Sequence, residues 1–459
     1  MPEGSSPLSM AKLGQIMESG HVDTVLVVFT DMQGRLAGKR VHARYFVDEV
    51  LDHGMEGCNY LLAVDVEMNT VPGYDISSWD QGYGDFVFKP DMRTLRAAPW
   101  LPGTVMVQCD LLWLDGTPVR QSPRQVLQAQ VDEATALGVE AFGATELEFL
   151  VFNNTFQEAH DADFRGLTGS TRYNVDYSIL GTSGDEPLIR DIRNTMYNAG
   201  LTVESSKGEC NLGQHEIAFK YDRVMTTADN HVVFKTASKE LAERHGKALT
   251  FMAKFDEREG NSCHIHMSLR GVDGSIVFAE DGGGADYSDG RSPIFKSFVA
   301  GVLATMRDFT LFYAPTINSY KRYQPGSFAP TAIAWGEDNR TCALRVIGTG
   351  SGLRVENRVP GGDVNPYLAQ AAMLAGGLFG IRAGLPLEAP FVGNAYQSDL
   401  ARVPSSLREA RDIFNDSELA KSAFGEDIVK HYVRAADVEL EAFGGAVTDW
   451  ERRRGFERF

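Results

Sequence analysis

The stretch GVEAFGATELEFLVF, residues 138–152, carries the most informative pattern in the chain. Its aliphatic and aromatic residues are typical of β-structure, and we predict a pair of strands here. Glu146 and Glu148 are two residues apart, so a strand places both carboxylates on the same face. An isolated Glu-x-Glu is typical of a solvated strand face. Here Leu147 and Phe149 make the run largely apolar, and we therefore expect the two glutamates to face an enclosed site.

Three further clusters place carboxylates and histidines close together in the sequence. They are Glu209 and Glu216 in KGECNLGQHEIAF, His264 and His266 in NSCHIHMSL, and Glu356 in LRVENR. Like charges that are packed together in a buried place repel each other unless a cation holds them. Carboxylates with a histidine suit hard or borderline divalent ions such as Mg²⁺ or Mn²⁺. The clusters therefore favour a divalent metal site.

Basic residues gather in the C-terminal part of the chain, among glycines and prolines. They are Lys321, Arg322, Arg340, Arg345, Arg354 and Arg358. Such a group in a globally acidic protein is typical of an anion clamp, and a divalent metal with arginines is the usual combination for phosphoryl transfer. The sequence has no GxxxxGK[ST] loop and no GxGxxG after a predicted strand. A P-loop or dinucleotide-binding enzyme is therefore disfavoured.

The composition narrows the class of protein further. The 459 residues carry a formal net charge of −18, which disfavours a nucleic-acid or anionic-membrane binder. Acidity that serves solubility alone is the alternative to acidity that serves metal binding. The five cysteines form no CxxC pair, which disfavours a disulfide scaffold and a structural zinc site. We find no signal-peptide pattern and no run of the ~20 apolar residues that a membrane span needs, so we expect a cytoplasmic protein.

We predict two domains. Residues 1–117 are expected to form a small mixed domain, with a hairpin in TVLVVFTDMQGRLAGKRV, residues 24–41, and further strands at 60–66 and 104–115. An Asp-Gly-Thr-Pro stretch then marks the boundary. Residues 118–459 are expected to form a large α+β domain whose antiparallel sheet holds the polar motifs. The apolar window Leu368–Ile381 is short and rich in glycine, and we predict a buried helix there.

Six motifs occur in an order that resembles the glutamine synthetase family, class I type, over essentially the whole chain: TELEFLVF, GECNLGQHEI, GNSCHIHMSL, INSYKRYQPGSFAP, NRTCALRV and ENRVPGGDVNPYLA. The resemblance implies an N-terminal β-grasp domain and a C-terminal catalytic domain. It implies a ligase that uses ATP to phosphorylate the γ-carboxylate of L-glutamate and then transfers the γ-glutamyl group to an amine. It also implies rings of subunits with active sites between neighbours, and we expect a dodecamer.

The same resemblance assigns roles residue by residue. One divalent ion, Mg²⁺ or Mn²⁺, is expected at Glu148, Glu209 and Glu216, and a second at Glu146, His264 and Glu356. Nucleotide contacts are expected from Glu204, Ser268 and Arg354. Contacts with the substrate glutamate are expected from Gly260, Arg322, Arg340 and Arg358. The expected catalytic set is Arg340, Arg345, Arg358 and His266.

Two segments depart from the pattern of the family. The flap PGSFAP, residues 325–330, carries Phe328 where typical members have the glutamate that closes over the ammonium site. The loop GYDISSW, residues 73–79, lacks the DGSS latch of typical members. Loss of a charge and gain of apolar surface suit an amine that carries carbon. We therefore predict an amine pocket lined by Phe328, Trp79 and Tyr74.

These departures most resemble the γ-glutamylamide synthetases, such as the glutamate–ethanolamine and glutamate–polyamine ligases. We predict a glutamate–amine ligase with ethanolamine as the favoured amine, and with methylamine or a polyamine as alternatives. Two other functions stay open: a true glutamine synthetase that uses ammonia, and a non-catalytic regulator on the same fold. The complete metal and arginine sets argue against an inactive enzyme.

Overall fold

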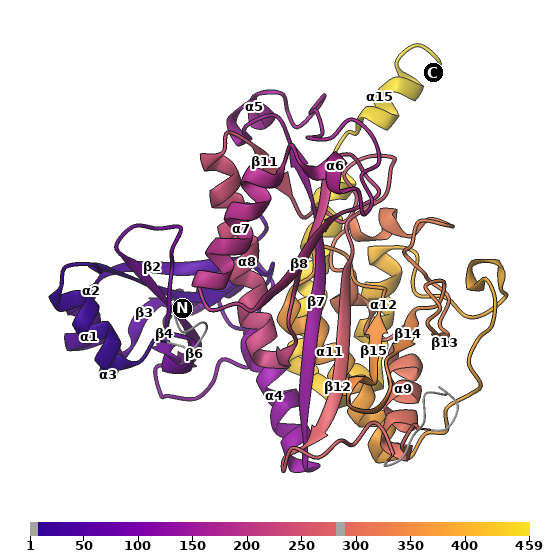
Figure 1. Cartoon of the computed structure of the whole chain (residues 1–459), viewed down its shortest axis with the longest axis horizontal. Coiled ribbons are helices and arrows are strands. Elements are labelled where there is room, and N and C mark those ends of the chain that lie inside the picture. Colours follow the sequence, from indigo (N-terminus) through magenta and orange to yellow (C-terminus); the bar gives the residue numbers. More distant parts are fainter. Residues whose placement is uncertain (1–7, 281–289) are drawn as a thin grey trace.

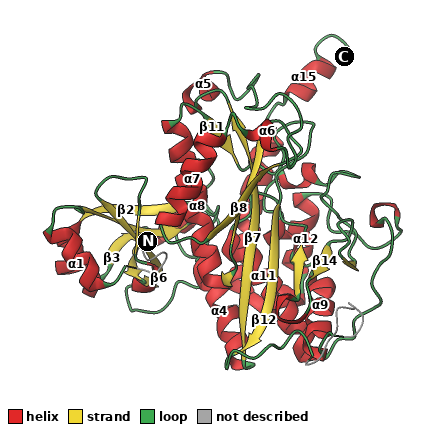
Figure 2. Ribbon diagram, viewed as in Figure 1, coloured by secondary structure: helices red, strands yellow, loops and turns green. Residues whose placement is uncertain are grey.

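The computed structural model describes residues 8–280 and 290–459. A small N-terminal unit lies beside a larger unit, in which long strands run across a layer of helices (Figure 1). The last helix, α15 (Asp449–Gly455), extends away from the larger unit. Helices and strands are mixed in both units (Figure 2), in agreement with the predicted α+β class.

The N-terminal unit is built on a six-stranded sheet in the order β2-β1-β6-β4-β3, with β5 paired to β6. Its strands are β1 (Thr24–Thr30), β2 (Leu36–His42), β3 (Met55–Cys58), β4 (Asp85–Pro90), β5 (Arg96–Ala97) and β6 (Thr104–Trp113). Its helices are α1 (Met10–Glu18), α2 (Ala43–Tyr45) and α3 (Leu51–His53), with a π-helical turn at Phe46–Val50. The antiparallel pair of β1 and β2 confirms the predicted hairpin, and β1 also pairs with β6 in parallel.

The strand predicted at residues 60–66 is wrong. The chain forms a 3-10 helix there, η2 (Asn59–Leu62), and the neighbouring strands are β3 and β4. Tertiary contacts explain the difference, because the buried Asn59 side chain donates to the Ile76 carbonyl and accepts from the Ser77 hydroxyl. The other 3-10 helices are η3 (Trp79–Gln81), η4 (Met92–Thr94), η5 (Ser319–Arg322), η6 (Gly350–Gly352) and η7 (Ala395–Gln397).

The large unit contains a nine-stranded sheet whose main path is β13-β14-β15-β12-β7-β9-β8, with β10 and β11 paired to β7. The strands are β7 (Val139–Phe152), β8 (Val203–Gly208), β9 (Gln214–Phe219), β10 (Asp222–Arg223), β11 (Ala248–Thr250), β12 (Cys263–Gly271), β13 (Trp335–Glu337), β14 (Leu344–Ile347) and β15 (Arg354–Asn357). The pairs are antiparallel, as predicted, except that β13 runs parallel to β14.

Strand β7 is one continuous strand of 14 residues, so the predicted pair of strands at 138–152 is wrong. A turn at Gly143 would have divided it. Instead, Gly143 allows a close approach, since a Cβ there would lie 2.8 Å from Oε1 of Gln370 on α11 (Pro366–Ala383). The same strand can therefore carry both glutamates in register with its neighbours on either side.

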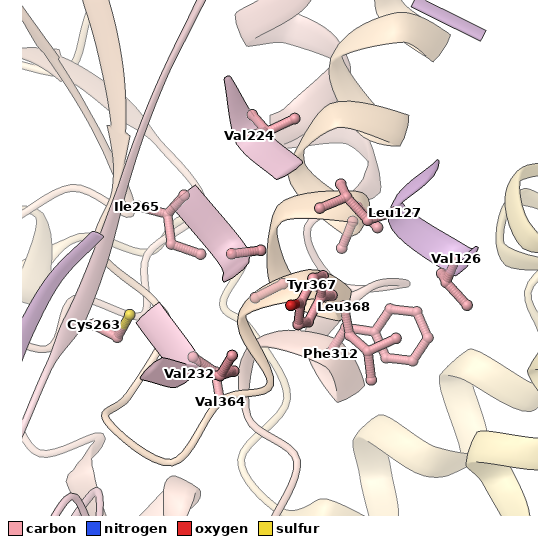
Figure 3. Close-up of a cluster of buried hydrophobic side chains, with 14 of the residues drawn as sticks. Val126, Leu127, Val224, Val232, Cys263, Ile265, Phe312, Val364, Tyr367 and Leu368 are labelled. Carbon is pink, nitrogen blue, oxygen red and sulfur yellow. The ribbon is translucent and has the colours of Figure 1, made fainter. Parts of the chain in front are cut away.

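Helices α4 (Pro123–Ala136) and α8 (Val224–Arg244) pack against β7, and α11 packs on both of them. The other helices of the large unit are α5 (Phe156–Asp161), α6 (Ile179–Thr182), α7 (Glu186–Asn198), α9 (Pro293–Thr305), α10 (Thr310–Tyr313), α12 (Leu407–Asp416), α13 (Glu418–Phe424) and α14 (Glu426–Gly445). Figure 3 shows buried side chains of α4, α8, α11 and β12 meeting in this core, among them Leu127, Val232, Leu368 and Ile265. Helix α11 is almost fully buried, which confirms the helix predicted at Leu368–Ile381.

A membrane-crossing helix is absent from the described residues, since none of their helices has the necessary length together with the necessary apolar character.

A buried ion-pair network joins the two units. Arg124 of α4 is 3% exposed, and its guanidinium lies 2.8 Å from Asp91, 2.6 Å from Asp110 and 3.1 Å from Asp229. Asp91 and Asp110 belong to the N-terminal unit, whereas Asp229 lies on α8. Tyr367 of α11 adds a hydrogen bond of 2.6 Å from its hydroxyl to Asp229. This network fixes the small unit against the helices that support the large sheet.

Candidate active site

One face of the large sheet gathers the polar residues of five neighbouring strands. Residues that lie opposite each other across antiparallel strands share a face. The opposed pairs are Glu216–Glu148, Glu146–His264, His266–Glu356 and Glu356–Arg345. The alternate residues of the same strands, including Leu147, Phe149 and Ile265, point to the helical core and are at most 1% exposed. Alternate residues of β7 therefore face opposite sides of the sheet: Glu146 and Glu148 share the polar face, as predicted, and Leu147 and Phe149 face the core.

The first predicted metal set comes together in the structure. Oxygen atoms of Glu148, Glu209 and Glu216 lie within 4.8 Å of one another. Glu209 follows β8, and the chain returns to β9 through a turn at Gly213, where φ is +74°. Lys207 reaches the same cluster, because its ammonium contacts Glu209 and lies 3.5 Å from Glu216. Sequence reasoning missed this lysine.

The second predicted set also comes together. Ligand atoms of Glu146, His264 and Glu356 lie within 4.8 Å of one another. The distance from His264 Nδ1 to Glu146 is 3.4 Å, and the distance to Glu356 is 3.5 Å. His266 donates to Glu146 at 2.9 Å. A third group, formed by Asp176, Glu209 and Cys210, overlaps the first set at Glu209.

Both clusters have the properties of cation sites. His264 Nε2 is buried without a hydrogen-bond partner, and burial lowers the pKa of His264, so its imidazole stays neutral and can act as a ligand. Burial, together with the charges of Glu146 and Glu148, raises the pKa of Glu216. For Glu146, burial alone would raise the pKa, but hydrogen bonds from the two histidines outweigh it and lower the pKa. The donor atoms are carboxylate oxygens and imidazole nitrogen, which fit Mg²⁺ or Mn²⁺.

Arginines border the second cluster. Arg358 lies 2.5 Å from Glu356, and Arg345 lies 3.0 Å from the other oxygen of the same carboxylate. The Nε of Arg358 is buried without a partner. Arg340 lies further out, with a side chain that is 54% exposed and 3.9 Å from Asp338. Arg345 and Arg358 are therefore largely buried, whereas Arg340 is open to an incoming ligand.

Arg322 is 2% exposed and binds neutral oxygens. It donates to the Val359 carbonyl at 2.9 Å and to the Ser262 hydroxyl at 2.8 Å. Gly260 packs beside it, because a Cβ at Gly260 would lie 3.1 Å from Cγ of Arg322 and 2.2 Å from the Ala253 carbonyl oxygen. The structure thus brings two of the residues predicted to bind glutamate side by side.

A polar network that the sequence did not predict holds this region in place. Gln214 Nε2 donates to Glu148 at 3.3 Å, to the Gly260 carbonyl at 2.9 Å and to Asn261 at 3.0 Å. The Ser262 amide donates to Glu148 at 2.6 Å. Tyr396 is a further missed residue: its hydroxyl is buried without a partner, and burial raises its pKa although the nearby charges of Arg322 and Arg358 oppose this. Gln214 and Ser262 lie inside the quoted motifs, but the sequence does not separate supporting residues from ligands.

A cavity of about 280 Å³ lies next to the second cluster and unites the predicted nucleotide contacts. Glu204, Ser268 and Arg354 all line it, together with Glu146 and His266. Aromatic and basic side chains lie on its wall, since the Arg270 guanidinium is 5.2 Å from the Phe142 ring centroid and 5.8 Å from that of Tyr221. Such a wall suits the planar base of a nucleotide, and the nearby Arg354 and His266 suit the anionic phosphates of the same nucleotide.

The three residues of the predicted amine pocket lie in different surroundings. Phe328 is 53% exposed, and its φ of +58° is a conformation that costs a non-glycine residue roughly 1–2 kcal/mol. Trp79 is 81% exposed and packs edge-on against Tyr83. Tyr74 is 4% exposed, lies against His431, and lines a cavity whose walls include neither Trp79 nor Phe328. The common pocket therefore stays a prediction.

Comparison with known proteins identifies the class. The family model described as the glutamine synthetase catalytic domain matches residues 120–455. The chain therefore belongs to the glutamine synthetase family, and it is a ligase of that family, as its motifs predict.

Two individual members of the family that are similar to this chain are glutamate–amine ligases. The chain is 58% identical over 452 residues to gamma-glutamylethanolamide synthetase GlnA4 from Streptomyces coelicolor, covering 98% of this chain and 96% of the relative. It is 37% identical over 448 residues to glutamate–isopropylamine ligase from a Pseudomonas species, covering 96% and 97%. A solved structure titled apo GmaS without ligand matches with a TM-score of 0.84 and 26% identity, covering 98% of this chain and 99% of that one. A GmaS/ADP complex matches with the same TM-score.

Proposed function

We propose that this protein is a glutamate–amine ligase that joins the γ-carboxyl group of L-glutamate to ethanolamine through a γ-glutamyl phosphate, at the expense of ATP. The observation that carries the proposal is the pair of carboxylate clusters on one sheet face, beside a cavity lined by the expected nucleotide contacts. The 58% identity to a gamma-glutamylethanolamide synthetase supports ethanolamine as the amine.

The carboxylate clusters and arginines are assigned to the phosphoryl-transfer step. Divalent metal, which we propose to be Mg²⁺ or Mn²⁺ held by Glu148, Glu209 and Glu216 and by Glu146, His264 and Glu356, supplies charge neutralisation at phosphate oxygens when bound. Arg345 and Arg358 add fixed positive charge beside Glu356. A glutamate carboxylate and a triphosphate repel each other, and such preorganised charges lower the cost of bringing them together.

The substrate glutamate is assigned to the loop around Gly260. Arg322 has hydroxyl and carbonyl partners but no carboxylate within 4.0 Å among the described residues, so it can receive the α-carboxylate of the substrate. Glycine is needed at position 260, because a Cβ there would collide with the Ala253 carbonyl, and the loop can therefore pack beside Arg322. Arg340 is exposed and can close on the transferred phosphate.

Phe328 is assigned to the amine. The flap holds an aromatic ring in a strained, left-handed conformation at a half-exposed position, and strain of this kind is concentrated at functional sites. An aromatic face offers apolar contact to the two CH₂ groups of ethanolamine and can rest against its cation before deprotonation. A glutamate at the same position would favour bare ammonium instead.

We also infer a homo-oligomer, with a dodecamer as the proposed state, and a cytoplasmic location. Large apolar side chains are exposed on the single chain, including Trp79, Ile179 and Leu180, and Phe456 and Phe459 at the C-terminus. Exposed apolar side chains in such number support contact with further subunits. All five cysteines are free, which supports a reducing compartment.

An amine panel tests the function. Phosphate release is measured with ATP, L-glutamate and Mg²⁺, and with ethanolamine, methylamine, isopropylamine, putrescine or ammonium in turn. We expect the highest kcat/KM with ethanolamine. Strong turnover with ammonium and none with the organic amines would show a true glutamine synthetase, and no turnover with any of them would support a non-catalytic regulator.

A flap variant tests the selectivity. Phe328→Glu is expected to lower kcat/KM for ethanolamine and raise it for ammonium, so that the ratio shifts by about tenfold or more. Phe164→Glu is the matched control, since Phe164 is also exposed (59%) and has a similar φ of +55°. An unchanged amine profile in Phe328→Glu would remove Phe328 from the amine site.

A further inference from the structure

A second cavity, of about 590 Å³, lies between the two units. Its walls come from the β1–β2 loop and residues 64–66 of the small unit, and from α8, residues 250–252 and α14 of the large one. None of the residues of the two carboxylate clusters lines it. The volume falls within the range of small-molecule sites.

Most of the wall is apolar. Leu36 and Val64 contribute from the small unit, and Phe251, Phe312 and Leu368 contribute from the large unit. Phe251, Phe312 and Leu368 are at most 4% exposed, so the cavity has a rigid apolar wall that belongs to the core of the large unit. A ligand that fills such a space needs an apolar body.

Two lysines on one turn of α8 line the same cavity. Lys235 and Lys239 are four residues apart, so their side chains lie on the same side of the helix. Their ammonium groups lie 5.6 Å and 6.0 Å from the centroid of the Phe251 ring. Burial lowers the pKa of both lysines, and to about 8 for Lys235. Two like charges are therefore held close together beside an apolar wall.

Neither lysine forms an ion pair with a described residue, although carboxylates of Asp65, Glu240, Asp363 and Glu439 also line the cavity. Within residues 8–280 and 290–459, no carboxylate lies within 4.0 Å of either ammonium group. Lys235 makes only a 3.3 Å hydrogen bond to the Gly362 carbonyl. Asp363 also lines the cavity, but its Oδ2 accepts from Thr316 and Ser319. Lys235 is partly buried and Lys239 is exposed, so the two ammonium groups present positive charge to a ligand at this end of the cavity.

We propose that this cavity binds a small organic anion, with a carboxylate between Lys235 and Lys239 and an apolar body against Phe251 and Phe312. The carboxylate offsets the repulsion between the two ammonium groups. The ring or chain attached to the carboxylate covers the apolar wall of the cavity and so removes it from contact with water. The site is separate from the proposed glutamate site, which is centred on Arg322. The inference does not depend on the proposed ligase activity.

The test uses 3-phenylpropionate as the probe and 3-phenylpropan-1-ol as its uncharged match. Isothermal titration calorimetry is run on the full chain with saturating L-glutamate, so that the proposed glutamate site does not compete. We expect saturable binding of 3-phenylpropionate and at least tenfold weaker binding of the alcohol. Equal binding of the two probes, or binding of neither, would overturn the proposal.

Variants locate the binding. Lys235→Met with Lys239→Met is expected to weaken 3-phenylpropionate binding about tenfold or more, whereas Lys296→Met, at an exposed lysine on α9, leaves it unchanged. Lys239→Met alone covers the case in which the double variant does not fold, and a loss of about threefold or more is expected. Wild-type affinity in the folded lysine variants would place the probe elsewhere and contradict the proposal.

Discussion

Two of the buried groups of charged side chains in the described residues differ in how their charges are balanced. At the junction of the two units, Arg124 is surrounded by Asp91, Asp110 and Asp229. For Asp91, burial raises the pKa, but hydrogen bonds from Arg93 and Arg124 outweigh it and lower the pKa to about 2. On the sheet face, burial and neighbouring carboxylates instead raise the pKa of Glu216.

The difference shows which group serves the fold and which is prepared for ligands. The junction supplies each carboxylate with a guanidinium, so folding itself completes the network. The sheet face holds five glutamates against Lys207, Arg345 and Arg358, and it leaves Nε2 of His264 without a partner. A buried site with excess negative charge gains stability when a cation arrives.

The largest expected effect is on activity at the sheet face. Glu146→Gln keeps the shape of the side chain and removes its charge, so we expect amine-dependent phosphate release to fall by about 100-fold or more. The fold is expected to be retained with some loss in the free energy of unfolding, because the hydrogen bonds from the two histidines lower the pKa of Glu146 and its charge therefore contributes to stability.

Glu140→Gln is the control for that variant, since Glu140 is on the same strand and pairs with Arg223 at the surface. It is expected to retain wild-type activity. Equal activity in Glu146→Gln and Glu140→Gln would erase the distinction between a ligand-binding cluster and a surface charge.

The next effect is on stability at the junction. Arg124→Met leaves three carboxylates without their shared guanidinium, and we expect a loss of about 3–5 kcal/mol in the free energy of unfolding. Arg93→Met is the control, because the Arg93 side chain is 81% exposed and its pair with Asp91 contributes about 0–1 kcal/mol. Chemical denaturation measures both. A loss below about 1 kcal/mol in Arg124→Met would mean that the junction is not held by this network.

A smaller effect is expected on the pH dependence of stability. Because the folded pKa of Asp91 is lowered from 3.8 to about 2, its contribution is complete above the unfolded pKa and is lost as the pH falls through about 2. The shift corresponds to about 2 kcal/mol. The stability difference between wild type and Asp91→Asn should therefore shrink by that amount between pH 5 and pH 2, measured by denaturation at each pH. A constant difference would show that the charge of Asp91 is not what stabilises the junction.

The sheet face was largely predictable from the sequence, whereas the junction was not. Glu146, Glu148, His264 and His266 alternate along strands, and alternation places side chains without any knowledge of distant contacts. Their metal grouping came from the family resemblance, and the geometry agrees with it. Arg124 and Asp229 are 105 residues apart, and no local pattern connects an arginine on one helix with an aspartate on another.

The predictions that failed also concern contacts between residues that are distant in the sequence. The pair of strands predicted at 138–152 is one strand, in which Gly143 allows the close approach of Gln370, more than 200 residues away in the sequence. Tyr74 was assigned to the amine pocket, which stays a prediction, and its burial against His431 of α14 likewise depends on a contact distant in the sequence. The cavity with Lys235 and Lys239 likewise exists only because segments of both units meet there.

The central claim is that the sheet face is built to receive divalent metal, and metal-dependent stability tests it most directly. Thermal unfolding of metal-free protein is compared with and without Mg²⁺ or Mn²⁺, for wild type and for Glu216→Gln. We predict that the metal raises the Tm of wild type and that Glu216→Gln loses most of this gain. Without metal, the variant should be at least as stable as wild type, because the raised pKa of Glu216 shows that its ionised form is disfavoured in the fold. A metal-free variant less stable than wild type, with an unchanged gain from metal, would contradict the account.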